Sequence, residues 1–195
     1  MSRKIYHTDG IVLSSRPQGE SNRLLLIFTE QLGLLKVRAQ GVRELKSKMR
    51  LHLYDWVPLK LSLVRGRDTW HLTGVIAPSV PVMSKEVRSL WRRFGRLLIR
   101  LVPESARDAE LYQFLAKGIS FIEEVNTGKD HKALELAEIL LVLRLLSHLG
   151  YLPKESRFSS EVWSEEWQPH YLLDLKEQKD LAVSLINQAI AASQL

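Results

Sequence analysis

The sequence of 195 residues contains no cysteine. This absence excludes a disulfide framework and any zinc site built on thiolates. Six histidines are present, but no two of them are spaced i, i+4, the spacing that places two imidazoles on one face of a helix. We therefore expect no metal ion and no other cofactor.

Sequence motifs of the common enzyme classes are missing as well. There is no phosphate-binding loop, no Gly-x-Ser-x-Gly nucleophile elbow and no dinucleotide fingerprint. Glu165 and Glu166 are adjacent, so their side chains point apart in a helix or a strand and make a poor acid–base pair. We expect a protein that is not an enzyme and whose function resides in a binding surface.

Long apolar runs are also lacking. The amino terminus has no continuous apolar stretch of the signal-peptide type, and the most apolar helix expected from the sequence is interrupted by Glu135, Glu138 and Arg144. We expect a cytoplasmic protein that makes no contact with a membrane.

Positive charge is abundant, and it is concentrated in one part of the chain. The formal net charge is +6 and the sequence pI is about 9.6. Residues 1–80 contain 13 lysines and arginines against 6 acidic residues, whereas residues 81–195 contain 15 against 16. Because solubility alone requires no such segregation, we interpret the first part as a nucleic-acid-binding region. Composition does not distinguish DNA from RNA.

The same 80 residues have the pattern of strands. Leu35, Val37 and Ala39 alternate with Lys36 and Arg38, which predicts a strand with an apolar inner side and a basic outer side.

Further strands are expected over residues 5–13, over residues 23–28 and on both sides of a turn at residues 65–68. Gly10 is expected to mark a bulge or a sharp bend, and Gly66 to supply a positive φ in the turn. Five short strands with a brief helical or irregular piece near residues 45–51 predict an OB-fold barrel.

After residue 80 the apolar residues have helical spacing. Ser84 is expected to cap a helix that ends near residue 102, and Ser105 with Asp108 resembles a capping box. Residues 133–146 include 11 apolar residues out of 14, which predicts a helix at the buried centre of a bundle. Residues 154–168 are expected to be irregular, and a last helix is expected over residues 177–192.

The predicted fold class is therefore α+β. A five-stranded OB-fold barrel over residues 1–80 would bind nucleic acid, and an all-α helical domain over residues 81–195 would dock protein partners.

The basic residues of the barrel are the candidate contacts to a nucleic acid backbone. Single-stranded nucleic acid requires cations along the phosphates. The candidate contacts are Arg23, Lys36, Arg38, Arg43, Lys46, Lys48, Arg50, Arg65 and Arg67. For the bases, such a site requires aromatic faces, and Trp70 and Tyr54 are candidate stacking residues, although an aromatic side chain in a small barrel is more often part of the core.

The helix after Ser84 carries a basic stripe of its own. Arg88, Arg92, Arg96 and Arg100 recur every fourth residue and therefore lie along one side of the helix. Two interpretations remain open for the stripe: pairing with acidic residues of the same chain, or binding of an anionic partner.

The order of motifs between Thr8 and Arg50 resembles the amino-terminal domain of the RecO family. The motifs are Thr8 to Leu13, Gly19 to Arg23, Phe28-Thr29, Gly33 to Leu35, Ala39 to Arg43 and Lys46 to Arg50, followed by Leu53 to Trp56 and the turn at residues 65–67. A second similarity to the family covers Leu143 to Leu146 and Leu149 to Pro153.

This resemblance implies a bacterial, nucleoid-associated DNA repair and recombination mediator. Such a protein binds single- and double-stranded DNA, anneals complementary strands, and works with RecR and the acidic tail of SSB to load RecA on SSB-coated DNA. Many members also carry a four-cysteine zinc site after the segment that matches Gly150 to Pro153, and this chain has none of those cysteines. An OB-fold protein-interaction adapter and an RNA-binding OB-fold protein are the alternatives.

Overall fold

The computed structural model describes residues 4–78, 83–128, 130–154 and 157–193. The chain divides into two compact units, the first formed by Met1–Met83 with Val102–Gln113 and the second by Ser84–Leu101 with Phe114–Leu195. The domain boundary expected between residues 80 and 81 lies outside the described residues.

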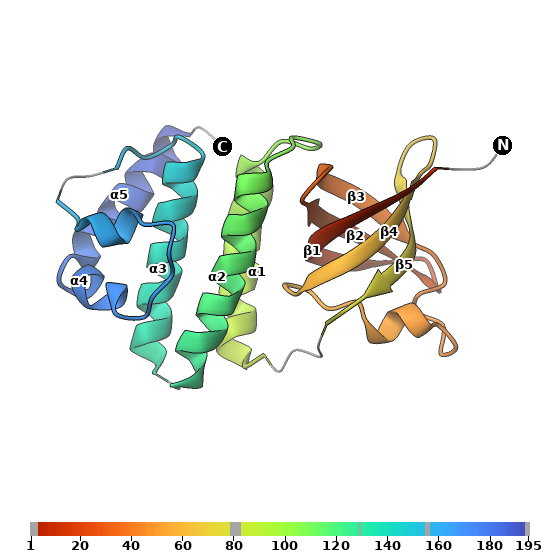
Figure 1. Ribbon diagram of the computed structural model, residues 1–195, viewed down its shortest axis with the longest axis horizontal. Helices are drawn as coiled ribbons and strands as arrows, with labels where there is room; N and C mark the ends of the chain where they lie inside the picture. Colours follow the sequence, from red (N-terminus) through yellow and green to blue (C-terminus); the bar gives the residue numbers. More distant parts are fainter. Residues whose placement is uncertain (1–3, 79–82, 129, 155–156, 194–195) are drawn as a thin grey trace. The chain divides into compact units, whose positions relative to one another are not determined.

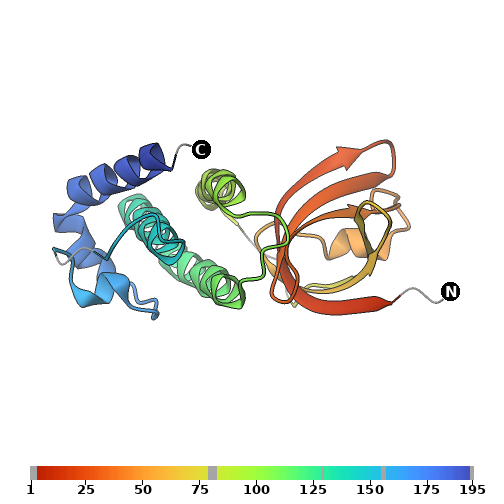
Figure 2. The same cartoon turned by 90° about the horizontal axis from the view of Figure 1, so that it is seen from above.

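The first unit contains a closed barrel of five strands (Figure 1). The strands are β1 (Ile5–Gln18), β2 (Asn22–Thr29), β3 (Gly33–Ala39), β4 (Pro58–Arg65) and β5 (Trp70–Ile76), with the short 3₁₀ helix η1 (Lys48–Leu51) between β3 and β4. The strand order around the barrel is β1-β2-β3-β5-β4, and the strands curve strongly to close it (Figure 2). With the helices that follow, this confirms the predicted fold class.

Alternating apolar residues fill the barrel. Leu35, Val37 and Ala39 of β3 are buried in its core, together with Leu59, Leu61 and Leu63 of β4, as the period of two predicts. The basic residues between them therefore lie on the outer side of their strands.

The structure corrects the predictions for two glycines. The bulge in β1 does not lie at Gly10, because the register shift falls between Val12 and Ser14. Gly10 allows close packing, since a Cβ there would lie 2.6 Å from Leu61 Cδ1. Gly66 is not among the glycines with a positive φ. A Cβ on Gly66 would lie 2.6 Å from the backbone oxygen of Thr69, so glycine is needed there for space.

Residues 102–113 run beside the start of β3. The backbone N–H of Ser105 donates to the carbonyl oxygen of Leu34 at 2.9 Å. Ser105 has a positive φ of 62°, so it does not act as the predicted helix cap. Asp108 caps the helix instead, since its Oδ1 accepts from the N–H of Leu111 at 2.7 Å.

Gly33 is the tightest point of this contact, which gives a first prediction. Gly33 has a φ of +71°, and a Cβ on it would lie 2.2 Å from the carbonyl oxygen of Ala106. We expect Gly33→Ala to lower the free energy of unfolding by about 3 kcal/mol, from backbone strain and overpacking together. Gly19 is the matched control, because it has a φ of +67° with no atom near its Cβ position. Gly19→Ala should cost about 1 kcal/mol in urea denaturation, and equal losses would contradict the close contact.

The second unit is built from helices. They are α1 (Lys85–Leu101), the part of α2 (Ala109–Thr127) from Phe114 onward, α3 (His131–His148), the 3₁₀ helix η2 (Ser160–Trp163), α4 (Tyr171–Glu177) and α5 (Lys179–Ala192). Ser84 caps α1 as predicted, because its Oγ accepts from the N–H of Val87 at 3.2 Å. α3 is the buried centre of this unit and contacts α1, η2, α4 and α5, which confirms the prediction for residues 133–146.

The helix expected over residues 177–192 is confirmed as α5, which begins two residues later than predicted. It is preceded by α4, a short helix that the sequence did not predict, and the two helices meet at Gln178. Leu181 and Leu185 are only partly buried, whereas Ala182 and Ala189 form the buried side of α5. No helix within the described ranges is long and apolar enough to cross a membrane.

Candidate nucleic-acid interface

One outer face of the barrel combines basic and apolar side chains from three strands. Lys36 and Arg38 of β3 stand opposite Leu26 and Leu24 of β2, which in turn stand opposite Ser14 and Arg16 of β1. Side chains of directly opposed residues in antiparallel strands point to the same side of a sheet. We call the surface formed by these six residues the β2–β3 face.

Arg16 was not predicted to belong to the site. The strand was expected to end near residue 13, but β1 continues to Gln18, past the register shift between Val12 and Ser14. The shift leaves the exposed Arg16 in the row of Leu24 and Arg38. The alternation of Ser14 and Arg16 was the available sequence signal for a longer strand. The register shift, however, hides on which side of the sheet these two residues lie relative to the residues before the shift.

The two predicted cations of the β2–β3 face differ in their partners. Lys36 Nζ forms an ion pair with the carboxylate of Glu104, and both side chains remain more than half exposed. Such an exposed pair contributes at most about 1 kcal/mol, so an anionic ligand can compete for the lysine. Arg38 Nε is buried and has no hydrogen-bond partner in the part of the chain that the structure describes. Its guanidinium is therefore uncommitted.

The turn between β4 and β5 borders this face. Thr69 Oγ1 donates to the carbonyl oxygen of Lys36 at 3.1 Å and so holds the turn against β3. Arg65 and Arg67, the predicted cations of the turn, are both exposed. The turn that carries both arginines is thus held next to Lys36, although Arg65 is in register with Trp70, on the strand side that faces the barrel interior.

Trp70 lies at the start of β5, in register with Val37 of β3 and Arg65 of β4. Its ring meets the ring of Tyr6 edge to face, with centroids 5.2 Å apart, and the side chain packs against the barrel core. Tyr54 also packs against that core. Both aromatic side chains are only partly exposed, which favours the core interpretation over a stacking platform.

The basic residues after β3 form a separate group. Arg43, Lys46, Lys48 and Arg50 are all exposed in the connection that contains η1. In Figure 1 this connection lies at the lower edge of the barrel and the β4–β5 turn at the upper edge. The nine candidate cations are therefore not gathered at one point of the barrel.

Arg23 stands apart from both groups. It lies in register with the buried Ala39, and thus on the strand side that faces the barrel interior, at the end of β2. Its charge acts on the carboxylate of Asp55. We therefore do not include Arg23 in the β2–β3 face.

The arginine stripe of α1 lies in the second unit. Arg88, Arg92, Arg96 and Arg100 are exposed along the helix, opposite buried residues such as Trp91 and Phe94. Within the described residues, Arg92, Arg96 and Arg100 form no ion pair or hydrogen bond, whereas the neighbouring Arg93 donates through Nε to Glu138 Oε1 at 2.7 Å. Three guanidinium groups of the stripe are thus available to an anion.

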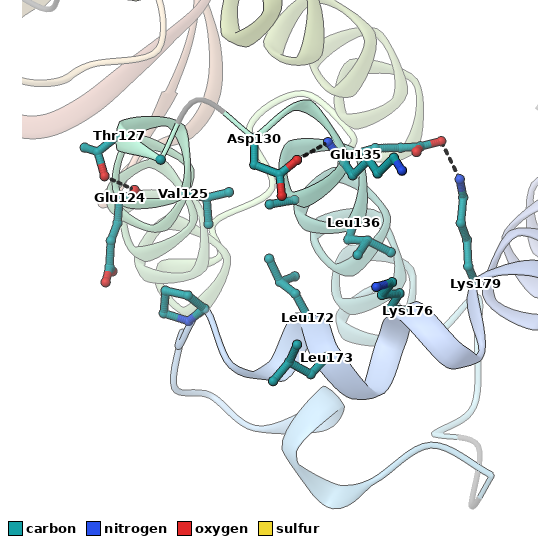
Figure 3. Close-up of a pocket in the computed structure, with 14 residues that line it drawn as sticks. Glu124, Val125, Thr127, Asp130, Glu135, Leu136, Leu172, Leu173, Lys176 and Lys179 are labelled. Carbon is teal, nitrogen blue, oxygen red and sulfur yellow. Dashed lines mark hydrogen bonds and ion pairs between the residues drawn. The ribbon is translucent and has the colours of Figure 1, made fainter.

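A cavity of about 650 Å³ is also present in the second unit (Figure 3). Its apolar wall includes Val125, Leu136 and Leu172, and the ion pair of Lys179 Nζ with Glu135 Oε1, at 2.7 Å, lies at its edge. Lysines and carboxylates alternate around it, so the charges give no preference for an anion or a cation. The cavity was not predicted because one of its walls is α4, a helix that the sequence did not indicate.

No cluster of three or more potential metal ligands occurs among the residues that the structure describes.

Comparison with known proteins agrees with the fold of the barrel. Residues 1–75 match the family model described as "Recombination protein O N terminal". Three relatives named "DNA repair protein RecO" come from Gloeothece citriformis, Heliobacterium modesticaldum and a Roseiflexus species, at 27%, 30% and 29% identity. The matches cover 82%, 78% and 79% of this chain, but 60%, 54% and 53% of those proteins.

The barrel is therefore an OB-type domain of the kind found at the amino terminus of RecO. Over most of its length the chain is also similar to DNA repair proteins of the RecO family, which confirms the resemblance inferred from its motifs. It spans between half and two thirds of the length of these curated relatives.

Proposed function

We propose that the protein is a recombination mediator that binds single- and double-stranded DNA on the β2–β3 face. OB-folds bind oligonucleotides on the face of strands 2 and 3, between the loop after strand 1 and the loop after strand 4. The observation that carries the proposal is the row of Arg16, Leu24 and Arg38 on that face, since it combines cations for phosphates with an apolar surface. The names of the relatives favour DNA over RNA as the ligand.

Strand annealing follows from charge neutralisation. Two phosphate backbones repel each other, and a cationic surface that binds one strand lowers the repulsion toward the second. Lys36 of the face and the exposed Arg65 and Arg67 of the β4–β5 turn would add to this effect. The proposed activity makes or breaks no covalent bond, and therefore needs no catalytic residue.

The helical residues, 81–195 in the proposed division, would dock protein partners. The α1 stripe of Arg88, Arg92, Arg96 and Arg100 is the proposed binding site for the acidic tail of SSB, because it offers cations beside apolar helix residues. We further propose contact with RecR and assistance to RecA loading on SSB-coated DNA, in the bacterial cytoplasm at the nucleoid.

The salt dependence of DNA binding tests the proposal. Arg16, Lys36, Arg38, Arg65 and Arg67 would neutralise five phosphates, so the log–log slope of affinity against salt concentration for a single strand should be about −3.5. The measurement is fluorescence anisotropy of a labelled oligonucleotide over a salt series, followed by an annealing assay on SSB-coated strands.

Other results would point to other functions. No binding at low salt would favour a protein-interaction adapter, and tighter binding of an RNA oligonucleotide of the same sequence would favour an RNA-binding protein. Binding with a slope near zero would contradict the cationic face.

A further inference from the structure

The described part of the barrel unit, residues 4–78 and 102–113, exposes no aromatic side chain to a large extent. Trp70, Tyr6 and Tyr54 are partly buried and pack against the barrel core. The exposed large apolar side chains of this unit are all aliphatic: Ile5, Leu45, Leu51 and Ile76. Besides the imidazole of His7 and the guanidinium groups, the exposed side chains that can contact the faces of nucleobases are therefore aliphatic.

Leu45 is the most exposed of these side chains, at 88%. It lies in a pair of tight turns after β3, in which the N–H of Glu44 donates to Gly41 O at 3.1 Å and the N–H of Ser47 donates to Glu44 O at 3.0 Å. These bonds fix the backbone on both sides of the leucine. Its exposure is thus a feature of an ordered turn.

The turns are also tied to the barrel. Val42 is fully buried in the core, and the N–H of Gly41 donates to Asn22 Oδ1 at 2.9 Å. Arg43 Nη1 donates to Gly19 O at 2.9 Å, in the loop between β1 and β2. Because this loop borders the β2–β3 face in an OB-fold, the turn of Leu45 lies beside the end of the proposed DNA path.

Cations surround the leucine in sequence. Lys46, Lys48 and Arg50 follow it and are exposed, and Leu51, next to Arg50, is 61% exposed. Alternating cationic and apolar side chains suit a strand whose phosphates and bases are both accessible. Aliphatic side chains also act as wedges between neighbouring bases in DNA-bending proteins.

We propose that Leu45 inserts between neighbouring bases of single-stranded DNA and interrupts their stacking. The inference rests on the proposed DNA binding and extends it past the β2–β3 face. The transfer of an exposed leucine from water to the space between two bases supplies the driving force, and the lysines and Arg50 hold the flanking phosphates. Bases held apart in this way are accessible to a complementary strand.

The test compares Leu45→Ala with the wild-type chain on an oligonucleotide that contains 2-aminopurine, whose fluorescence rises when the base is unstacked. The wild-type chain should increase this fluorescence and Leu45→Ala should not. The variant should also bind roughly tenfold more weakly, with the salt slope unchanged, because no phosphate contact is lost. Leu173→Ala is the matched control, since Leu173 is 68% exposed in the second unit.

The possible outcomes distinguish a failure of the Leu45 proposal from a failure of the DNA-binding proposal. Absence of wild-type binding would contradict the DNA-binding proposal itself. Wild-type binding with an unchanged affinity and fluorescence response in Leu45→Ala would overturn the wedge and leave the β2–β3 face in place. Leu45→Trp gives an independent readout, because the fluorescence of the new indole should change when DNA saturates the protein, and a constant signal would place the turn away from the strand.

Discussion

Replacement of Arg144 by alanine is expected to lower the free energy of unfolding by about 3 to 5 kcal/mol. Arg144 lies on α3 and is only 6% exposed. Its guanidinium donates to three backbone carbonyl oxygens of the segment after α3, those of Val162 at 2.7 Å, Glu166 at 2.6 Å and Glu161 at 2.8 Å. Alanine would remove the side-chain donor of all three acceptors, although the carbonyl oxygen of Glu161 would keep the N–H of Ser164 as a donor.

The charge of Arg144 is part of this effect. Burial lowers the pKa of the guanidinium to about 10, which still leaves it protonated at neutral pH. The guanidinium also lies over the ring of Trp167, 4.6 Å from the centroid, and 5.7 Å from the ring centroid of Tyr171. Hydrogen bonds from a charged donor are stronger than neutral ones, and the two rings add cation–π attraction.

Urea denaturation of the full chain, followed by tryptophan fluorescence, measures the loss. Arg96→Ala is the matched control, because Arg96 is exposed and should change stability by no more than about 0.5 kcal/mol. Arg144→Lys keeps the charge but loses the planar guanidinium. Its loss of unfolding free energy should therefore fall between those of Arg144→Ala and Arg96→Ala. Equal stability of the Arg144→Ala and Arg96→Ala variants would show that the three carbonyl contacts do not hold the segment.

Arg144 also illustrates what sequence patterns cannot give. The apolar run around it correctly predicted a buried helix, and a charged residue within that run was expected only to interrupt it. Its role depends on carbonyl groups about twenty residues further along the chain. No local pattern specifies such a contact.

The barrel was predictable because its strands have an apolar side and a polar side. The alternation of Leu35, Val37 and Ala39 with Lys36 and Arg38 is a local property of the chain, and the closed barrel preserves it. The row that joins Arg38 to Arg16 depends instead on the register between strands, which the shift in β1 alters by one residue. The cations of β3 in the candidate site could therefore be predicted, but Arg16 and the arrangement of the row could not.

The helix ends show a similar limit. Ser105 and Asp108 have the spacing of a capping box, yet the backbone of Ser105 pairs with β3 and leaves the cap to Asp108 alone. α4 has only seven residues, and no side chain caps it at His170. Such a helix is stabilised mainly by tertiary packing of its buried residues, here Tyr171, Leu172 and Leu175, so local signals are weak.

The double substitution Lys36→Glu, Arg38→Glu should weaken binding of single-stranded DNA roughly 100-fold or more at 0.1 M salt, because two cations that meet phosphates become two anions that repel them. The salt slope should become less steep by about 1.4, the contribution of two phosphates. The control Lys117→Glu, Lys154→Glu makes the same change in net charge at exposed positions of the second unit, and its affinity should remain close to that of the wild-type chain.

Glu104→Gln tests the same face in the opposite direction. It removes the ion-pair partner of Lys36 and leaves the lysine free for a phosphate. The affinity for DNA should therefore rise a few fold, and the slope of affinity against salt concentration should steepen.

The double variant Lys36→Gln, Arg38→Gln is a control that introduces no negative charge. It avoids a new repulsion with Glu104 and should still lose the two phosphate contacts. If both double variants bound DNA as tightly as the wild-type chain, the strand would have to follow another surface of the barrel. The exposed cations after β3, Lys46, Lys48 and Arg50, would then be the next to reverse, because they belong to a group that these substitutions leave intact.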